Sequence, residues 1–97
     1  MKVIIAGSRD FTDYKAVEAE ITYLLNQLPK EPHTIISGGA RGADQIGIQY
    51  ARNHNMPCKI YLPDWDKYGR KGPNHAGNVR NGQMRDVAEA LIALWDF

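Results

Sequence analysis

The stretch of sequence that decides the fold is Thr34-Ile35-Ile36-Ser37-Gly38-Gly39-Ala40-Arg41-Gly42-Ala43-Asp44. Its β-branched start is typical of a strand that is buried on both faces of a parallel sheet. The strand leads through glycines directly into a helical pattern that starts at Ala43. Such a corner presents backbone N–H groups and the positive end of a helix dipole, so the sequence predicts an anion site that suits phosphate.

A second corner of the same kind lies near the start of the chain, where Val3-Ile4-Ile5-Ala6 leads into Gly7-Ser8-Arg9. Each corner carries one arginine, Arg9 or Arg41, and a guanidinium binds phosphate oxygens bidentately. Asp44 has two interpretations. A carboxylate in the first turn of a helix is stabilised by the dipole even where it binds nothing, which is the favoured interpretation. The alternative is that Asp44 accepts a hydrogen bond from a ribose hydroxyl or orients Arg41. The residues expected to bind the ligand at these corners are Gly7, Ser8, Arg9, Ser37, Gly38, Gly39, Ala40, Arg41, Gly42 and Asp44.

Strands and helices alternate along the rest of the chain. Strands are expected at residues 2–6, 34–37, 57–62 and 90–95, and helices at residues 13–28, 43–53 and 78–87. Right-handed crossovers then give an α/β, Rossmann-like three-layer sandwich whose parallel sheet has about four strands in the order 3-2-1-4. The ligand crevice is expected at the carboxyl ends of the first and fourth strands, and the long loop at residues 63–77 has a length typical of a functional segment.

Length and composition describe a single domain over residues 1–97, with a formal net charge of +1. That balance argues against a general nucleic-acid coat protein or a membrane-surface binder. Cys58 is the only cysteine and is expected to be a buried structural thiol, which favours a reduced, cytoplasmic setting. The stretch from Lys67 to Arg85 is locally basic, because it holds five Lys or Arg residues and no Asp or Glu.

The absence of several known motifs argues against particular kinds of chemistry. Neither corner is a Walker A loop or a complete Gly-x-Gly-x-x-Gly fingerprint, so ATP hydrolysis and dinucleotide redox chemistry lose support. The three histidines lack the spacing of metal ligands, and we expect no metal or cofactor. Ser8 and Ser37 have no base nearby in sequence that would make them nucleophiles. Packing competes with base stacking or a lid function at Trp65, Tyr68, Arg70, Met84 and Trp95.

Four separated segments carry a resemblance: residues 6–11, residues 37–44, residues 65–69, and the run Ala76-Gly77-x-x-Arg80-Asn81-x-x-Met84. Together with the closing residues 90–96, they look like the YspA/YpsA-related family of the SLOG superfamily. The resemblance implies a Rossmann-like domain that binds a nucleotide or a nucleotide-derived ligand through its glycine corners. It also implies that Arg80 and Asn81, the Arg-Asn pair of the family, face the same crevice.

Two departures from the family pattern concern the loop and the end of the sequence. Residues 71–75 look like an insertion, and the sequence stops at Asp96-Phe97, where similar members continue with a Gly-x-Ser-x-Gly-Thr turn. The related nucleoside-phosphate hydrolases carry their catalytic glutamate in that later region, in a Pro-Gly-Gly-x-Gly-Thr-x-x-Glu motif. If the sequence is complete, that turn and that glutamate are both absent, and no catalytic residue is assigned.

Three functional hypotheses follow, in decreasing order of support. The first is a binding module that senses or sequesters a nucleotide-derived small molecule. The second is a nucleoside-phosphate N-glycosidase, for which Asp10, Asp44 and Asp96 are the candidate acids. The third is single-stranded nucleic-acid binding in the manner of the related DNA-processing protein DprA. The fourth strand is expected at the edge of the sheet, and its apolar character favours a homodimer.

Overall fold

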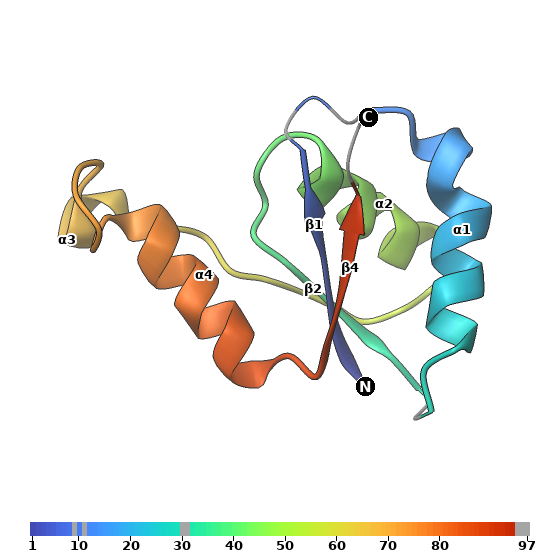
Figure 1. Cartoon of the computed structure of the whole chain (residues 1–97). Helices are drawn as coiled ribbons and strands as arrows, with labels where there is room; N and C mark the ends of the chain where they lie inside the picture. Colours follow the sequence, from blue (N-terminus) through green and yellow to red (C-terminus); the bar gives the residue numbers. More distant parts are fainter. Residues whose placement is uncertain (9, 11, 30–31, 95–97) are drawn as a thin grey trace.

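The computed structural model describes residues 1–8, 10, 12–29 and 32–94. Four parallel strands form one sheet in the order β3-β2-β1-β4, as the sequence predicts. Helices alternate with the strands along the chain, which confirms the α/β class (Figure 1). The elements are β1 (Lys2–Gly7), α1 (Tyr14–Asn26), β2 (Thr34–Ser37), α2 (Ala43–Asn53), β3 (Cys58–Ile60), α3 (Trp65–Tyr68), α4 (Ala76–Val87) and β4 (Ala90–Leu94).

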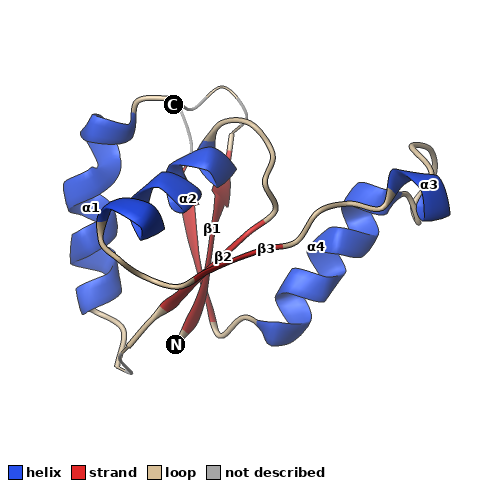
Figure 2. Cartoon of the chain, turned by 180° about the vertical axis from the view of Figure 1, so that it is seen from behind, coloured by secondary structure: helices blue, strands red, loops and turns tan. Residues whose placement is uncertain are grey.

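The main hydrophobic core lies between one face of the sheet and helices α1 and α2. Alternate residues of a strand point to opposite faces, so Val3 and Ile5 of β1 point into this core. Ile21 of α1 and Ile46 of α2 pack there at helical spacing, and both are buried. Figure 2 shows the strands nearly edge-on, with α1 and α2 on the left of the sheet in this view and α4 on its right. The predicted three-layer arrangement is therefore present.

The opposite face of the sheet carries a much smaller core. Ile4, Ile36 and Met84 form its buried cluster, with Met84 supplied by α4. Met84 is 5% exposed, so it is a core residue and is not a surface on which a base could stack. Leu91 of β4 is 62% exposed. The α4 face of the sheet is thus covered less completely than the α1 and α2 face.

Local capping explains where the helices begin. The Asp13 side chain accepts a hydrogen bond from Ala16 N, and this N-cap fixes the predicted start of α1. Helix α4 begins at Ala76, two residues before the predicted start, because the Nδ1 atom of His75 accepts from Gly77 N and Asn78 N. The single-turn helix α3, which Asp64 caps by accepting from Lys67 N, was not predicted.

The strands differ from the expected ranges mainly at their ends. Strand β3 is only Cys58–Ile60, shorter than predicted at both ends, and β4 ends at Leu94 within the described part of the chain. Cys58 is less buried than expected, because it is only partly buried at the edge of the main core, and this burial raises the pKa of its thiol. Strand β4 pairs with β1 alone among the described strands, which places it at an edge of the sheet as expected.

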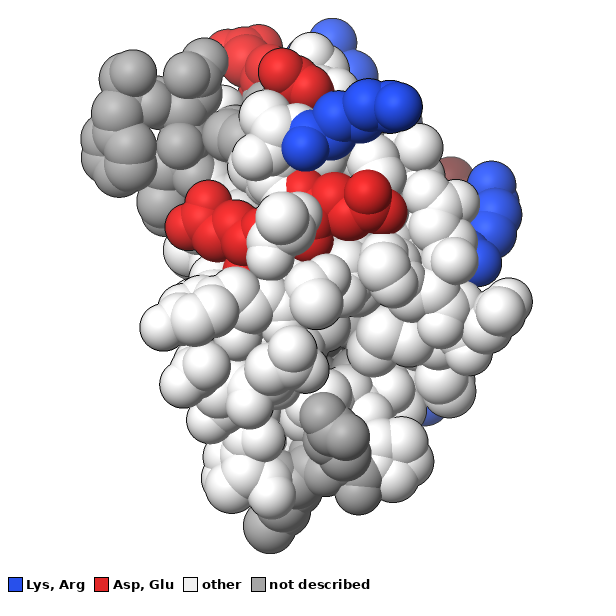
Figure 3. Space-filling model, turned by 90° about the vertical axis from the view of Figure 1, so that its right-hand side faces the viewer, with Lys and Arg blue, Asp and Glu red and all other residues white. Residues whose placement is uncertain are grey.

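The face of the molecule on the α1 side carries a mixture of charges (Figure 3). Figure 3 shows acidic and basic side chains next to one another over the upper part of one face, and mostly uncharged residues below them. A surface that binds nucleic acid through its backbone is usually dominated by basic groups, and this face does not have that character. Within the described ranges, no helix combines the length and the apolar character that a bilayer crossing requires.

Candidate functional site

The two glycine corners meet at the carboxyl ends of the strands. The backbone N–H of Ala43, at the start of α2, donates to the carbonyl of Ser8 over 3.0 Å. Ser8 in turn donates its own N–H to the carbonyl of Leu94, at the end of β4, also over 3.0 Å. These two bonds connect the turn after β1 to the end of β4 and to the start of α2. Bends that are far apart in the sequence therefore lie side by side, although Gly7 and Ser8 line neither of the two hollows described below.

The first corner uses its glycine for close packing. A Cβ atom on Gly7 would lie 1.8 Å from the carbonyl oxygen of Leu94, and φ at this residue is +154°. Only glycine allows the two strands to approach so closely. The Oγ of Ser8 accepts from Asp10 N over 3.2 Å, which shapes the turn. Arg9, the predicted phosphate ligand of this corner, lies outside the described residues.

The second corner, residues 38–42, is held in shape by its own hydrogen bonds. The Oγ of Ser37 donates to Asp44 O over 3.0 Å and accepts from Gly39 N over 3.2 Å. One carboxylate oxygen of Asp44 accepts from Ala40 N over 3.2 Å. Ser37 is fully buried. Both side chains thus have a structural role in the loop, and Asp44 fits neither of its two earlier interpretations alone.

Arg80 connects α4 to this loop. Its Nη1 donates to the carbonyl of Gly38, and its Nε donates to Asn81 Oδ1 over 2.7 Å. The side chain is 8% exposed, although it carries a guanidinium. A Cβ on Gly38 would lie 2.7 Å from Arg80 Nη1 and 2.9 Å from Asp44 Oδ2. Gly38 is therefore enclosed by a buried cation and a carboxylate, which leaves no room for a side chain.

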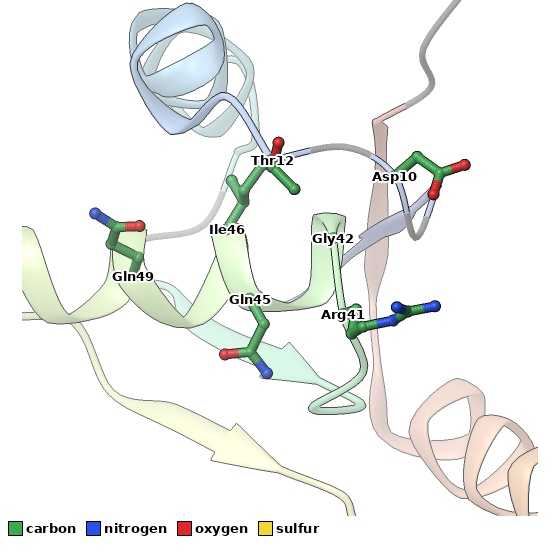
Figure 4. Close-up of a pocket in the computed structure, with 7 residues that line it drawn as sticks. All are labelled: Asp10, Thr12, Arg41, Gly42, Gln45, Ile46 and Gln49. Atoms are coloured by element: carbon green, nitrogen blue, oxygen red, sulfur yellow. The ribbon is translucent and has the colours of Figure 1, made fainter.

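One hollow lies on the α2 side of the loop and has a volume of about 490 Å³. We call it the α2 hollow. Arg41 and Asp10 lie at the same side of it in Figure 4, with Gln49 at the far end on α2. Its lining is a mixture of hydroxyl, amide and charged groups around one apolar side chain. The described residues that line it are Asp10, Thr12, Arg41, Gly42, Gln45, Ile46 and Gln49.

A second hollow lies on the other side of the loop, against α3 and α4, with a volume of about 550 Å³. We call it the α4 hollow. The glycine loop forms one wall, α4 forms another, and Trp65 of α3 stands at the rim. The described residues that line it are Gly38, Gly39, Ala40, Leu62, Pro63, Trp65, His75, Gly77, Asn78, Arg80 and Asn81.

The structure thus divides the predicted site residues between two hollows. Arg41 and Gly42 line the α2 hollow, whereas Arg80, Asn81 and Trp65 line the α4 hollow. The loop residues 38–40 also line the α4 hollow. Gly7, Ser8, Ser37 and Asp44 line neither hollow. Gly7 packs against Leu94, whereas Ser8, Ser37 and Asp44 make hydrogen bonds to residues of the second corner or of the start of α2.

Among the residues predicted to stack on a base or to act as a lid, Trp65 lines the α4 hollow and Arg70 lies beside it. Arg70 lies over the ring of Trp65, with 4.8 Å between its Cζ and the ring centroid. Tyr68 is 36% exposed and stands under Lys67, outside the described lining of both hollows. Trp95 lies outside the described residues. A base-stacking role therefore remains a prediction for Trp65, with Arg70 as its neighbour.

Several lining residues were missed by the sequence analysis. Gln45 and Gln49 stand one helical turn apart on α2, a spacing that places them on one face of the helix. Two amide side chains four residues apart, directly after a glycine corner, could have been predicted from the sequence to face the ligand. His75 and Asn78 lie at the start of α4, which the sequence analysis placed two residues too late. The error in the helix boundary concealed both of them.

Carboxylates and metal-ligating groups are sparse around the two hollows. Asp10 lines the α2 hollow, Asp44 is bound into the loop, and Asp96 lies outside the described residues. No group of three His, Cys, Asp or Glu side chains within the described ranges is arranged to hold a metal ion. The described side chains around the two hollows are suited to binding an anion, through Arg41, and a planar ring, through Trp65.

Comparison with known proteins agrees with this geometry. The model of the YspA, cpYpsA-related SLOG family matches residues 1–68, a range that contains both glycine corners. The chain is also similar to the gene 61 protein of Mycobacterium phage D29, with 32% identity over 100 aligned residues that cover 95% of this chain and 74% of that protein. No solved structure matches the chain significantly. The chain therefore belongs to the YspA, cpYpsA-related SLOG family.

Proposed function

We propose that this protein binds a nucleotide or a nucleotide-derived ligand and holds its phosphate at Arg41, Gly42 and the start of α2. Membership of the SLOG family suggests a nucleotide-related ligand. The observation that carries the proposal is the way in which α2 begins. Its N-cap is Gly42, at φ +75°, and no side chain caps the helix there.

The other helices differ from α2 in this respect. Asp13, Asp64 and His75 cap α1, α3 and α4 with their side chains. The first N–H groups of a helix need an acceptor from outside the helix, and an anion can supply it. Among the described residues, the amides of Arg41 and Gly42 have no acceptor, whereas those of Gly39, Ala40 and Ala43 do. The Ser8 carbonyl already accepts from Ala43 N, so the amides that support phosphate binding are those of Arg41 and Gly42, just before the helix.

Arg41 supplies the cation next to those amides. Its side chain is exposed and lines the α2 hollow. A guanidinium beside a helix N-terminus makes charge-assisted hydrogen bonds to phosphate, which are about twice as strong as neutral ones. The hydrogen bonds that Ser37 and Asp44 make within the loop fix its conformation before the ligand binds. Binding therefore costs less conformational entropy.

Isothermal titration with a panel of nucleoside mono- and diphosphates, dinucleotides and cyclic nucleotides tests the proposal. Arg41→Ala should weaken binding by about 1.5–3 kcal/mol, the range for hydrogen bonds to charged groups. Arg52→Ala is the matched control, because Arg52 is an exposed arginine in the last turn of the same helix. It should leave the affinity unchanged.

Two outcomes would count against the proposal. One is a chain that binds no member of the panel, and the other is an equal loss of affinity in the Arg41→Ala and Arg52→Ala variants. The same incubations, followed for free base, test the N-glycosidase hypothesis. Asp10 is the one of its three candidate acids that lines a hollow in the described part of the chain, so Asp10→Asn should abolish any release.

A further inference from the structure

We propose that the α4 hollow receives the planar heterocyclic base of the ligand. This inference rests on the proposed function, in which the phosphate lies at Arg41 and Gly42. The glycine loop is the wall between the two hollows, since residues 38–40 face the α4 hollow while residues 41–42 face the α2 hollow. A ligand held by its phosphate at the tip of the loop can therefore place its base on the α4 side.

Aromatic surface is the first reason for choosing the α4 side. Trp65 lines this hollow and keeps 36% of its surface exposed. The His75 ring lies nearly parallel to it, with 6.2 Å between centroids and 13° between planes. Every nucleobase presents a flat π-face, and stacking on an aromatic side chain is the commonest way in which proteins hold an unpaired base. Arg70, over Trp65, adds a second flat cationic surface at the rim.

Fixed polar groups are the second reason. Asn81 accepts from Arg80 Nε through its Oδ1, so its amide NH₂ is the end that remains for a ligand. Arg80 is only 8% exposed, and its hydrogen bond to the Gly38 carbonyl holds the guanidinium in a fixed position. The edge of a base carries donors and acceptors that need partners in fixed positions. This wall of the hollow supplies such partners on a helix.

Space is the third reason. Glycines stand at three positions of the lining, Gly38, Gly39 and Gly77. A Cβ on Gly77 would lie 2.9 Å from His75 Cε1 and 3.7 Å from Trp65 Cη2, so a side chain there would occupy the space beside the rings. A hollow of about 550 Å³ falls in the range of small-molecule sites.

Ligand truncation separates the base from the phosphate. The probes are the four nucleoside 5′-monophosphates, ribose 5-phosphate, which lacks the base, and the four nucleosides, which lack the phosphate. Trp65→Leu should weaken the best-bound monophosphate about tenfold or more, the effect of a lost stacking contact, and leave ribose 5-phosphate within twofold. Trp65→Phe should restore most of the affinity. Tyr68→Leu is the matched control, because Tyr68 lies on the same short helix at the same 36% exposure but does not line the hollow.

Fluorescence gives a second readout that a purely structural role would not change. The chain has two tryptophans, so Trp95→Phe leaves Trp65 as the only one. Monophosphates and nucleosides should quench Trp65, and ribose 5-phosphate should not. Quenching by nucleosides should persist in the Arg41→Ala variant, so the base site is tested even if the phosphate proposal fails.

Three results would overturn the inference. The first is binding of monophosphates with no quenching of Trp65. The second is an equal effect of Trp65→Leu on monophosphates and on ribose 5-phosphate, which would indicate damage to the loop. The third is a base-dependent loss of affinity in Gln49→Ala but not in Trp65→Leu, which would place the base in the α2 hollow.

Discussion

The two glycine corners look alike in sequence, yet their glycines do different things. Gly7 is required because β4 lies against it, and a Cβ there would overlap the Leu94 carbonyl. Gly38 is required because Arg80 and Asp44 enclose it, and Gly42 because it begins α2 at positive φ. The first corner therefore packs the sheet, whereas the second shapes a loop with a hollow on either side. A glycine at a βα corner is not by itself a sign of a ligand.

The largest expected effect tests the packing role of the first corner. Gly7→Ala would place a Cβ 1.8 Å from a backbone oxygen that cannot turn away. We expect a loss of about 3 kcal/mol in the free energy of unfolding, at the upper end for overpacking, measured by urea denaturation. Gly82→Ala is the control, because Gly82 is inside α4 and a Cβ there would meet only Arg85 Nη2, at 3.7 Å.

That control should raise stability by about 0.5–1 kcal/mol, because alanine favours a helix interior over glycine. A stable Gly7→Ala variant would remove the distinction between the corners, since the first glycine would then be free to serve a ligand alone.

The next effect concerns the hydrogen bond from Arg80 that stabilises the second corner. Arg80→Met removes the bond to Gly38 O and leaves that carbonyl without its donor. We expect a loss of about 2 kcal/mol in the free energy of unfolding, the cost of a lost charge-assisted bond. Arg85→Met, on the exposed surface of the same helix, should change stability by less than about 0.5 kcal/mol.

Coupling between Arg80 and Gly38 sharpens this test. Because Arg80 Nη1 is the nearest atom to a Cβ on Gly38, the damage done by Gly38→Ala should be smaller in the Arg80→Met background. A double-mutant cycle should show about 0.5 kcal/mol or more of coupling. Simple additivity of the two losses would mean that the guanidinium does not enclose the glycine.

The serines of the two corners should also differ. Ser37 is buried and its hydroxyl makes two hydrogen bonds within the loop, whereas the hydroxyl of Ser8 accepts one, from Asp10 N. We expect Ser37→Ala to cost about 1.5 kcal/mol and Ser8→Ala about 0.5 kcal/mol, again by urea denaturation. Equal losses would show that the hydroxyl at the first corner is as structural as the one at the second.

The strands could be located from the sequence because β-branched runs and glycine corners are local signals, and their order then followed from the right-handed crossovers of a parallel sheet. Sequence reasoning also predicted the range of α2, Ala43–Asn53. It could not separate the roles of Gly7 and Gly38, because each role depends on a residue more than 40 positions away, Leu94 or Arg80. The same long range hides the bond between Ala43 N and Ser8 O that joins the corners.

Within the candidate site, sequence reasoning found the loop but not the division into two hollows. Met84 is an example. Its position four residues after Arg80 does not show whether it faces a ligand or the core, and its burial depends on packing against Ile4 and Ile36, which are distant in the sequence. His75 shows the converse error, because an imidazole is an uncommon N-cap and gave no start signal for α4.

The smallest expected effect concerns the helices that follow the two corners. The Tyr14 hydroxyl of α1 donates to Glu18 Oε2 over 2.6 Å, and His54, after α2, lies 3.1 Å from the same oxygen through its Nε2. The hydrogen bond from Tyr14, followed by His54, lowers the pKa of Glu18 from its usual 4.5. Burial and Glu18 together raise the pKa of Tyr14 to about 12.

A carboxyl whose pKa is lower in the folded state adds stability above its unfolded pKa and loses that contribution as pH falls through the folded value. Tyr14→Phe removes the main cause of the shift in Glu18, so it should lower stability at pH 7. The difference from the parent chain should shrink as the pH is lowered from about 4.5, measured by urea midpoints. Tyr23→Phe is the control, because Tyr23 lies on the same helix and is 62% exposed. A difference that persists unchanged at pH 3, or that appears equally in Tyr23→Phe, would show that the Glu18 carboxylate does not link the two helices.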